Sequence, residues 1–526
     1  MVQAPSGDTR KRVLIIGAGA AGTACAWSLS RSPEKFDVHL WEALSQPGGV
    51  ASSLKVDTGA GPLIINDQVQ GGALSYRHNL ALLKTFGFKP TPVMMRIAFG
   101  VGGAQWTNHS PSRLTSDLQP EIKRFGDVLK TISRLEPIFI FVPIDKVLTW
   151  WGFSQAFREE MVLPLVALFF GTGNQTSNVA AAVIARVFLD PDLRLFDYSP
   201  ERLLDSVPEM FAFPVLQDIF KTIAASSPYT LHCNRPLKSV KRDKTGITAT
   251  DAHGVSEHFT DIVYACDAET VLQTLEKPTW LEKKLLGNVT YYTDYCVTHE
   301  DTDYMSKMYD IKPAQRDNYF VRTYPEAPKK IEMSFNLSTY QPHLAEAGLD
   351  VYQTYYLNAK DKAMWTDGQV AEDKVLAKRW MRQFAHTWQH FAFWVPFVRF
   401  IQGTQHTYFA GSYTMVNTQE IAVMSGIAAA ERLGAEYPFP DDPLAVKQYE
   451  MYLGIAHGKK RGKPTGKAYP APSQATMDKV AAALATATPP KSHVLPIPTP
   501  SSLSPPSSNS GSPQPSMRDI VAPVSV

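Results

Sequence analysis

One stretch near the start of the chain, RKRVLIIGAGAAGTACAWSLS (residues 10–30), joins an apolar run to a glycine-rich turn. Its residues 13–16 are β-branched or leucine, which predicts a strand buried on both faces of a parallel sheet. Gly17, Gly19 and Gly22 follow as G-x-G-x-x-G. In this pattern the first glycine permits a tight turn, the second lets backbone approach a pyrophosphate, and the third allows close helix–strand packing.

A second predicted strand strengthens this interpretation. The segment FDVHLWE (36–42) ends at Glu42, about 20 residues after Gly22, where an acidic side chain accepts a hydrogen bond from a ribose hydroxyl. The helix that begins at the turn, with Ala21 in its first turn, directs its amides and dipole at the phosphates. A simple glycine-rich turn explains the glycines but not Glu42. We therefore predict a dinucleotide-binding βαβ unit.

Composition narrows the function classes. The chain has 526 residues, 44% of them hydrophobic, which is enough for two packed domains. Its 52 basic and 50 acidic residues give a formal charge of +2, which argues against a nucleic-acid surface. The one basic cluster, GKKRGK (458–463), is consistent with a solvated linker and, alternatively, with a localisation or anionic-surface signal.

The cysteines and the apolar runs indicate in which cellular compartment we expect the protein. Cys25, Cys233, Cys266 and Cys296 are too few and too scattered for a disulfide framework or a zinc site. No run approaches the roughly 18 apolar residues of a membrane span. The apolar run after the first basic residues belongs to the nucleotide turn rather than to a signal peptide. We expect a cytoplasmic protein with free thiols, no transmembrane segment and no metal.

One further cluster, at 299–301, combines histidine with two carboxylates. Adjacent strand residues point to opposite faces, so these three side chains cannot converge on one ion without a special turn. We expect a surface loop there.

The predicted nucleotide-binding elements are dispersed along the chain. Residues 233–266 predict three short strands followed by a buried strand at 262–265. Residues 406–413 predict a strand that ends in glycine, and residues 418–435 a helix that stops at Gly434. Between these elements lie two long aromatic-rich stretches, roughly 95–200 and 280–395.

Three apolar segments in or beside these stretches, at 137–153, 161–171 and 388–403, either line an apolar pocket or form core. Beyond about residue 470 the composition changes. Residues 488–516 are dominated by proline and serine and cannot bury enough apolar surface to order themselves. Residues 477–488 predict one isolated helix before them.

Several segments resemble the FAD-dependent amine oxidase superfamily. They are EALSQPGG (42–49), NRPLKSV (234–240), FAGSY (409–413) and TQEIAVMSGIAAAERL (418–433). The resemblance is strongest to a subgroup of predicted NAD/FAD-binding oxidoreductases. It extends more distantly to carotenoid desaturases and a flavin-dependent fatty-acid double-bond isomerase. Further shared segments, at 56–59, 64–67, 76–87, 263–275, 285–305 and 402–413, carry it over nearly the whole chain except the tail.

The resemblance implies an α/β fold with a Rossmann-like FAD-binding domain assembled from three segments, 10–94, 205–279 and 400–460. A mixed α+β substrate domain would comprise 95–204 and 280–399, and 470–526 would be a disordered tail.

It also implies the site residues. The cofactor-binding set is Gly17, Gly19, Ala21, Gly22, Glu42, Gly48, Gly49, Leu237, Gly411, Ser412, Gln419, Glu420 and Ile421. Tyr413 and Asn417 would lie close to the flavin as catalytic candidates, with Lys146, Trp150 and Trp151 as alternatives.

This chain departs from the family pattern at three places. The Gly-Gly that relatives usually carry ahead of the helix near Asp218 is absent from MFAFPVLQDIF (210–220). The chain has Val50 where relatives usually carry Arg or His, and VNTQE (416–420) where they have GFHED. No cysteine stands in a context for covalent flavin attachment, so the expectation is noncovalent FAD in an altered environment.

The implied activity is that of an FAD-dependent oxidoreductase that takes a hydride from a small apolar substrate, an amine, lipid or polyene, with dioxygen or another acceptor. Two alternatives stay open: a redox-neutral isomerase of an unsaturated fatty acid, and a nucleotide-binding protein without catalysis.

Overall fold

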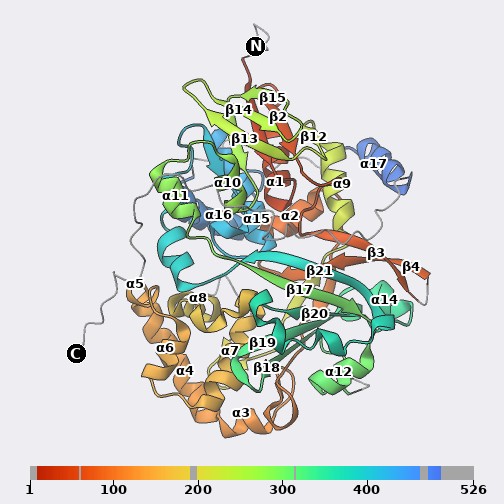
Figure 1. The fold of residues 1–526 in the computed structure, drawn as a ribbon, viewed down its shortest axis with the longest axis vertical. Helices are drawn as coiled ribbons and strands as arrows, with labels where there is room; N and C mark the ends of the chain where they lie inside the picture. Colours follow the sequence, from red (N-terminus) through yellow and green to blue (C-terminus); the bar gives the residue numbers. More distant parts are fainter. Residues whose placement is uncertain (1–8, 59–60, 190–197, 313–314, 462–471, 487–526) are drawn as a thin grey trace, which may run out of the picture. The chain divides into compact units, whose positions relative to one another are not determined.

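The predicted first strand, β1 (Lys11–Ile16), is the central strand of a five-stranded sheet with the order β12-β2-β1-β16-β22. All four pairings in this sheet are parallel. The partners are β2 (Phe36–Trp41), β12 (Thr230–His232), β16 (Asp261–Tyr264) and β22 (Thr407–Phe409). Three distant parts of the chain therefore build one sheet, as the dispersed motifs predict. The computed structural model describes residues 9–58, 61–189, 198–312, 315–461 and 472–486 (Figure 1).

Two helices cross each other against this sheet. Helix α1 (Ala20–Ser30) is buried along its whole length and contacts α15 (Gln419–Leu433). A Cβ at Gly426 would lie 2.0 Å from the carbonyl oxygen of Ala21, so only glycine allows this close crossing. The predicted stop of α15 is confirmed, because Gly434 takes a left-handed conformation with φ +117°.

The rest of the nucleotide-binding side follows the sequence prediction closely. The three strands expected before β16 form an antiparallel sheet of β13 (Leu237–Arg242), β14 (Ile247–Asp251) and β15 (Ser256–Phe259). The helices on this side are α2 (Arg77–Thr85), α9 (Leu216–Ser226), α10 (Ala268–Thr274), α11 (Trp280–Leu286) and α16 (Pro443–His457).

A seven-stranded sheet forms the other main layer, with the order β21-β17-β20-β19-β18-β7-β8. Its strands are β7 (Ile97–Phe99), β8 (Trp106–Thr107), β17 (Tyr291–His299), β18 (Tyr319–Tyr324), β19 (Ala327–Asn336), β20 (Tyr352–Tyr356) and β21 (Val375–Phe384). The β7–β18 pairing is parallel and the others are antiparallel. Strands from both aromatic-rich stretches thus share one sheet.

A group of helices drawn in orange and yellow accompanies this sheet (Figure 1). They are α3 (Arg113–Asp117), α4 (Gln119–Arg134), α5 (Glu136–Phe139), α6 (Ile144–Trp150), α7 (Leu163–Phe170) and α8 (Ala181–Leu189). In α4, Ile122, Phe125, Leu129 and Ile132 recur at helical spacing and are fully buried, which explains why the helix forms and which face it buries.

Smaller elements complete the described residues. β3 (Ser52–Thr58) pairs with β4 (Gly61–Asp67), β9 (Tyr198–Ser199) pairs with β10 (Leu203–Leu204), and β11 (Glu209–Ala212) lies between β5 (Gly71–Ala73) and β6 (Thr91–Met94). The short helices are α12 (Thr302–Tyr309), α13 (Leu337–Tyr340) and α14 (Pro342–Glu346). The described residues all fall within one compact unit, so the domain boundaries stay a prediction.

Two sequence expectations need correction. His299 ends β17 and is fully buried, so 299–301 is not a surface loop; its imidazole bonds Thr354 at 3.0 Å, and Asp301 caps α12. The helix expected to be isolated spans Gln474–Thr486 (α17) and packs on α9, with Val480 buried. The segment from 487 onward, expected to be disordered, lies outside the described residues.

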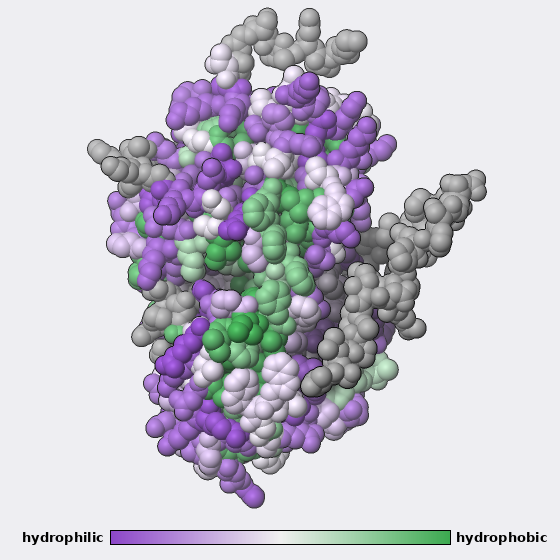
Figure 2. Space-filling view, turned by 90° about the vertical axis from the view of Figure 1, so that its left-hand side faces the viewer, coloured by the Kyte–Doolittle hydropathy of each residue, from purple (hydrophilic) through white to green (hydrophobic). Residues whose placement is uncertain are grey.

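One side of the described residues exposes a continuous run of apolar surface (Figure 2). Within the described part of the chain, no helix combines the length and the apolar character that a membrane crossing requires.

Candidate dinucleotide site and substrate cavity

The glycine turn has the geometry that its spacing predicts. Gly17 has φ +96°, and a Cβ there would lie 2.9 Å from the carbonyl oxygen of Ala265. At Gly22 a Cβ would lie 1.8 Å from the carbonyl oxygen of Gly17, so this position brings α1 against the turn. At Gly19 a Cβ would meet only the Gly48 carbonyl, at 4.0 Å. The second glycine therefore leaves its backbone open, as a phosphate-binding turn requires.

The N-terminus of α1 is suited to an anion. Its N-cap, Gly19, makes no side-chain capping bond. The first amides of α1 are thus not held by a cap and, with the helix dipole, favour a phosphate group.

Glu42 lies at the end of β2 and braces this turn. Its carboxylate accepts hydrogen bonds from the amides of Ala18 at 2.7 Å and Leu44 at 2.9 Å. Burial raises the pKa of Glu42, and the backbone amide bonds oppose that rise. Because a carboxylate offers about four acceptor positions, the side chain keeps acceptor capacity toward a ribose hydroxyl.

The Gly48–Gly49 pair closes the turn from the other side. Gly48 donates its N–H to the carbonyl of Ala18 at 2.8 Å, and both glycines have positive φ, +128° and +60°. Val50, which follows them, is 58% exposed. Its aliphatic side chain lines the cavity and offers no hydrogen bond.

A cavity of about 770 Å³ connects these residues with the second sheet. Nearly all of the predicted site residues line it: Gly17, Gly19, Ala21, Glu42, Gly48, Gly49, Leu237, Gly411, Ser412, Tyr413, Asn417 and Gln419. Gly22, Glu420 and Ile421 are not among the lining residues. A volume of this size lies within the range of ligand pockets, about 300–1,000 Å³.

Arg235 and Trp41 line the cavity beside Glu42. The guanidinium of Arg235 lies 3.8 Å from the centre of the Trp41 ring, and ion pairs with Asp251 at 2.9 Å and Glu257 at 2.7 Å hold it there. This stacked, ion-paired arginine forms a rigid wall at the dinucleotide end.

The third segment contributes Gly411 to Asn417. Gly411 has φ +136° and donates its N–H to Ser425 at 2.7 Å. Tyr413 is buried, its carbonyl accepts from the Trp394 indole at 2.7 Å, and its hydroxyl has no partner among the described residues. Such an orphaned hydroxyl at a cavity wall is a group that a bound ligand can satisfy.

The catalytic candidate Asn417 is held on both sides. Its side chain donates to Gln383 at 3.0 Å and accepts from Ser412 at 3.2 Å. Its backbone N–H donates to Nε2 of His386 at 2.8 Å. Burial lowers the pKa of His386 well below its usual value, which keeps this acceptor nitrogen unprotonated.

Two of the predicted cofactor-binding residues, Glu420 and Ile421, make hydrogen bonds within the protein at the start of α15. The hydroxyl of Thr418 accepts from the amide of Ile421 at 3.1 Å. The Glu420 carboxylate accepts from the backbone amides of His78 and Asn79 at 2.8 and 3.0 Å, which anchors the start of α2. Gln419 alone of the predicted trio lines the cavity.

Toward the second sheet the cavity wall becomes aromatic. Its lining there includes Phe169, Tyr319, Phe335, Tyr340 and Tyr355. The Phe335 ring contacts both neighbours, with centroids 3.7 Å from Tyr319 and 5.2 Å from Tyr355.

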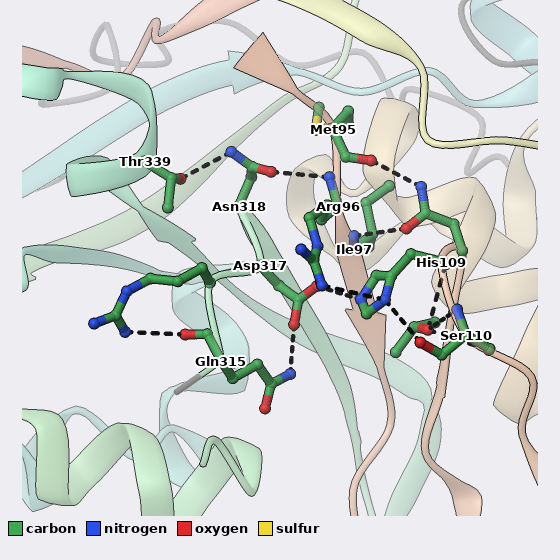
Figure 3. Close-up of polar contacts among 12 residues, drawn as sticks. Met95, Arg96, Ile97, His109, Ser110, Gln315, Asp317, Asn318 and Thr339 are labelled. Carbon is green, nitrogen blue, oxygen red and sulfur yellow. Dashed lines mark hydrogen bonds and ion pairs between the residues drawn. The ribbon is translucent and has the colours of Figure 1, made fainter. Parts of the chain in front are cut away.

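Met95 belongs to the same wall, and a polar cluster fixes the chain beside it (Figure 3). The Asn318 side chain accepts from the Arg96 amide at 2.8 Å and donates to Thr339 at 2.8 Å. The His109 ring lies 2.6 Å from the buried carboxylate of Asp317. These bonds join the two aromatic-rich stretches at the cavity.

Asp294, on β17, is an ionisable cavity residue that the sequence analysis missed. It is fully buried, and its oxygens accept from the backbone amides of Asn358 at 2.7 Å and Gly173 at 3.4 Å. No ion pair to Asp294 is found among the described residues. Burial raises the pKa of Asp294 to about 7. A carboxyl group that titrates near neutrality in a cavity can hold or accept a proton.

Other candidates lie elsewhere. Lys146, Trp150 and Trp151 do not line the cavity, and Trp150 is 63% exposed. Of the three apolar segments, 161–171 contributes lining residues, whereas 137–153 and 388–403 contribute none. The four cysteines are free thiols, as expected. No group of three or more His, Cys, Asp or Glu suited to a metal occurs among the described residues.

The turn, the uncapped helix and the five-stranded parallel sheet have the features of a Rossmann-like fold, and the cavity extends from them to the seven-stranded sheet. Residues 15–90 match the family model "NAD(P)-binding Rossmann-like domain". A search of curated proteins finds no match to this sequence.

Solved structures share the fold over most of the chain. A CLA-producing fatty acid isomerase from P. acnes is 15% identical, with a TM-score of 0.57 over 81% of this chain and 99% of that one. Cyclohexylamine oxidase from Brevibacterium oxydans is 14% identical, with a TM-score of 0.58 over 81% and 99%. Putrescine oxidase bound to putrescine is 12% identical, with a TM-score of 0.58 over the same shares. The fold predicted from the superfamily resemblance is therefore confirmed.

Proposed function

We propose that this chain is an oxidoreductase that binds FAD noncovalently and takes a hydride from a small apolar substrate, with dioxygen as an acceptor. One observation carries the proposal: a single cavity runs from the dinucleotide turn of the first sheet to an aromatic wall on the second. An extended dinucleotide with a redox-active ring at its far end suits such a cavity. A nicotinamide enzyme would normally complete its site within one contiguous doubly wound domain.

The residues present fit this cofactor. The Gly17–Gly22 turn and the uncapped α1 would hold the pyrophosphate, Glu42 the adenosine ribose, and Leu237 with Arg235 the adenine end. Gly411, Ser412 and the start of α15 would lie against the ring system. When bound, the flavin supplies a hydride acceptor.

The chain's own groups would orient the substrate and handle its proton. The aromatic wall of Tyr319, Phe335 and Tyr355 would hold an apolar substrate and exclude water. Asp294 would accept a proton at its carboxylate oxygens, or pair with a cationic amine, because its oxygens face only backbone amides. Tyr413 and Asn417 would orient substrate at the third segment.

The test begins with the purified chain. It should be yellow and should release intact FAD on denaturation, because no cysteine bond is proposed. Anaerobic bleaching against amines, fatty acids and polyenes then identifies the substrate class. A colourless preparation that binds NADH and takes up no flavin would overturn the proposal.

A second candidate is a redox-neutral double-bond isomerase of an unsaturated fatty acid. The aromatic and aliphatic wall suits an acyl chain, and a fatty acid isomerase shares the fold. Hydrogen peroxide separates the two candidates: an oxidase releases it in proportion to substrate consumed, and an isomerase does not.

A flavin spectrum that neither substrates nor dithionite bleach would favour a third function, nucleotide binding without catalysis.

A further inference from the structure

The surface shown in Figure 2 contains a band of large apolar side chains that the cavity does not use. We define the apolar band as Leu135, Ile138, Phe141, Phe393, Phe397 and Phe400. Their exposed fractions run from 41% for Phe393 to 60% for Ile138. The exposure of a contiguous group of large apolar side chains to water is unfavourable in free energy. Such a patch therefore marks a contact surface.

Two segments remote in the sequence build the band. Ile138 lies in the short helix α5, and Leu135 and Phe141 flank it. Phe393 lies in the π-helical turn η8 (His390–Trp394), Phe400 in the 3-10 turn η9 (Val398–Phe400), and Phe397 caps the start of η9. The Phe141 and Phe393 rings lie 6.1 Å apart, as do those of Phe397 and Phe400. These are the apolar segments that line no part of the cavity, so they require another explanation.

Buried neighbours hold the band in place. Phe139 and Trp394 point inward and are 7% and 0% exposed, while Ile138 and Phe393 beside them point outward. The turns are thus anchored by their inner side chains, and the outward positions are apolar although the fold does not bury them.

The charges beside the band are mostly basic. Arg399 lies 4.9 Å from the Phe400 ring, and a Cβ added at Gly458 would lie 3.3 Å from the Arg399 side chain. The exposed Lys459 and Lys460 follow Gly458 in the sequence. Helix α11, which contacts η8, adds exposed Lys283 and Lys284.

The acidic groups of these two segments are already engaged. Glu136 pairs with Arg186 at 2.6 Å, and Glu282 pairs with Arg242 at 2.6 Å. A basic margin in which the carboxylates of α5 and α11 are ion-paired complements a negatively charged surface.

We propose that the apolar band and its basic margin dock on an anionic lipid bilayer surface without spanning it. Phenylalanine and aliphatic side chains would enter the headgroup–acyl boundary, and Arg399, Lys459 and Lys460 would face the lipid phosphates. The charge complementarity favours lipid over a second copy of the chain, whose band would carry the same basic margin. This inference stands independently of the proposed flavin chemistry.

Vesicle flotation of the full chain tests the proposal. We use vesicles of phosphatidylcholine alone and of phosphatidylcholine mixed with phosphatidylglycerol, at low and high salt. The wild type should associate with the mixed vesicles, more weakly at high salt and more weakly with the neutral vesicles. The triple variant Phe141→Ser, Phe397→Ser, Phe400→Ser should lose association at least about tenfold with both vesicles.

Charge variants supply the matched control. Arg399→Glu, Lys459→Glu and Lys460→Glu together should reduce association with the mixed vesicles to the level seen with neutral ones. Lys238→Glu, Lys241→Glu and Lys244→Glu together change the net charge equally on exposed positions around β13 and should leave association unchanged. Unchanged thermal midpoints show that each variant folds.

Three outcomes would overturn the proposal. The first is a wild type that binds neither vesicle. The second is a control triple that loses as much association as the Arg399 triple. The third is a wild type that does not bind lipid and that light scattering shows to be a dimer, together with a serine triple variant that is a monomer. The band would then be an interface between two copies of the chain.

Discussion

At the scale of single residues, the most informative position is Asp294, a buried carboxyl group in the cavity with a pKa of about 7. The unfolded chain ionises this group near pH 3.9. Between these values the folded state carries a proton that the unfolded state lacks. The stabilising effect of that proton is complete below about pH 4 and is lost as the pH rises through 7.

Asp294→Asn removes this titration. The wild type loses stability from pH 5 to pH 8 through this group, and the variant does not. The free energy of unfolding of the variant minus that of the wild type should therefore increase by on the order of 2 kcal/mol from pH 5 to pH 8. Urea unfolding at the two pH values measures the difference, and the same variant at pH 5 is its own control for altered hydrogen bonding. If Asp294 takes the substrate proton, the variant should also lose the limb of the pH–rate profile near 7. Equal differences at both pH values would contradict the prediction.

Glu42 gives a second residue-scale prediction. Glu42→Arg replaces an acceptor by a side chain that can only donate, and it removes the bonds to Ala18 and Leu44. Flavin content should fall at least about tenfold, because both the ribose contact and the turn geometry suffer. Absorbance of the purified protein measures this. A switch to a 2′-phosphorylated dinucleotide at similar affinity would instead indicate a nicotinamide cofactor.

At the scale of elements, a buried ion pair joins the neighbouring strands β18 and β19. Arg322 lies 3.1 Å from Glu332, and the Glu332 carboxylate also accepts hydrogen bonds from the hydroxyls of Tyr304, Tyr309 and Tyr324. Removing one partner of such a pair leaves an uncompensated buried charge.

Arg322→Met should therefore destabilise the fold by about 3–5 kcal/mol, measured by urea unfolding. Lys378→Met breaks the exposed pair between Lys378, on β21 of the same sheet, and Glu372, in the turn before β21, and should cost less than about 1 kcal/mol. Similar losses for the two variants would show that the buried pair is not the stronger constraint.

Helix α17 supports an independent element-scale prediction. Because Val480 is buried and the helix packs on α9, removing residues 472–526 should lower the thermal midpoint by about 2–4 °C. Removing 487–526 alone is the control and should leave the midpoint unchanged, since that proline- and serine-rich composition does not form a core. Equal midpoints for both truncations would mean that α17 adds no stability.

At the scale of the whole molecule, the sequence predicts the nucleotide-binding side well. The strands around β1, the glycine turn and the boundaries of α15 follow local rules of periodicity and glycine placement. The role of Glu420 could not be read that way, because its partners His78 and Asn79 are hundreds of residues away.

Asp294 was equally hidden from local rules. A lone carboxylate in the aromatic run YYTDYC was the available signal, but only the sheet register shows that it faces a cavity. The exposed band was hidden for a similar reason. Segments 137–153 and 388–403 have core-like composition, and composition does not show which side chains of a buried turn point outward.

The order of strands in the first sheet also matters during synthesis. The β1 strand pairs with β16, and β16 in turn pairs with β22, whose last residue is Phe409. A ribosome must therefore release more than three quarters of this polypeptide before the sheet is complete, and α15 follows later still. From the synthesis of β16 until that of β22, the edge of β16 that pairs with β22 has no partner strand. Nucleotide binding would therefore occur late in the synthesis of the chain. A nascent chain that stalls before β22 would expose the edge of β16 to chaperones.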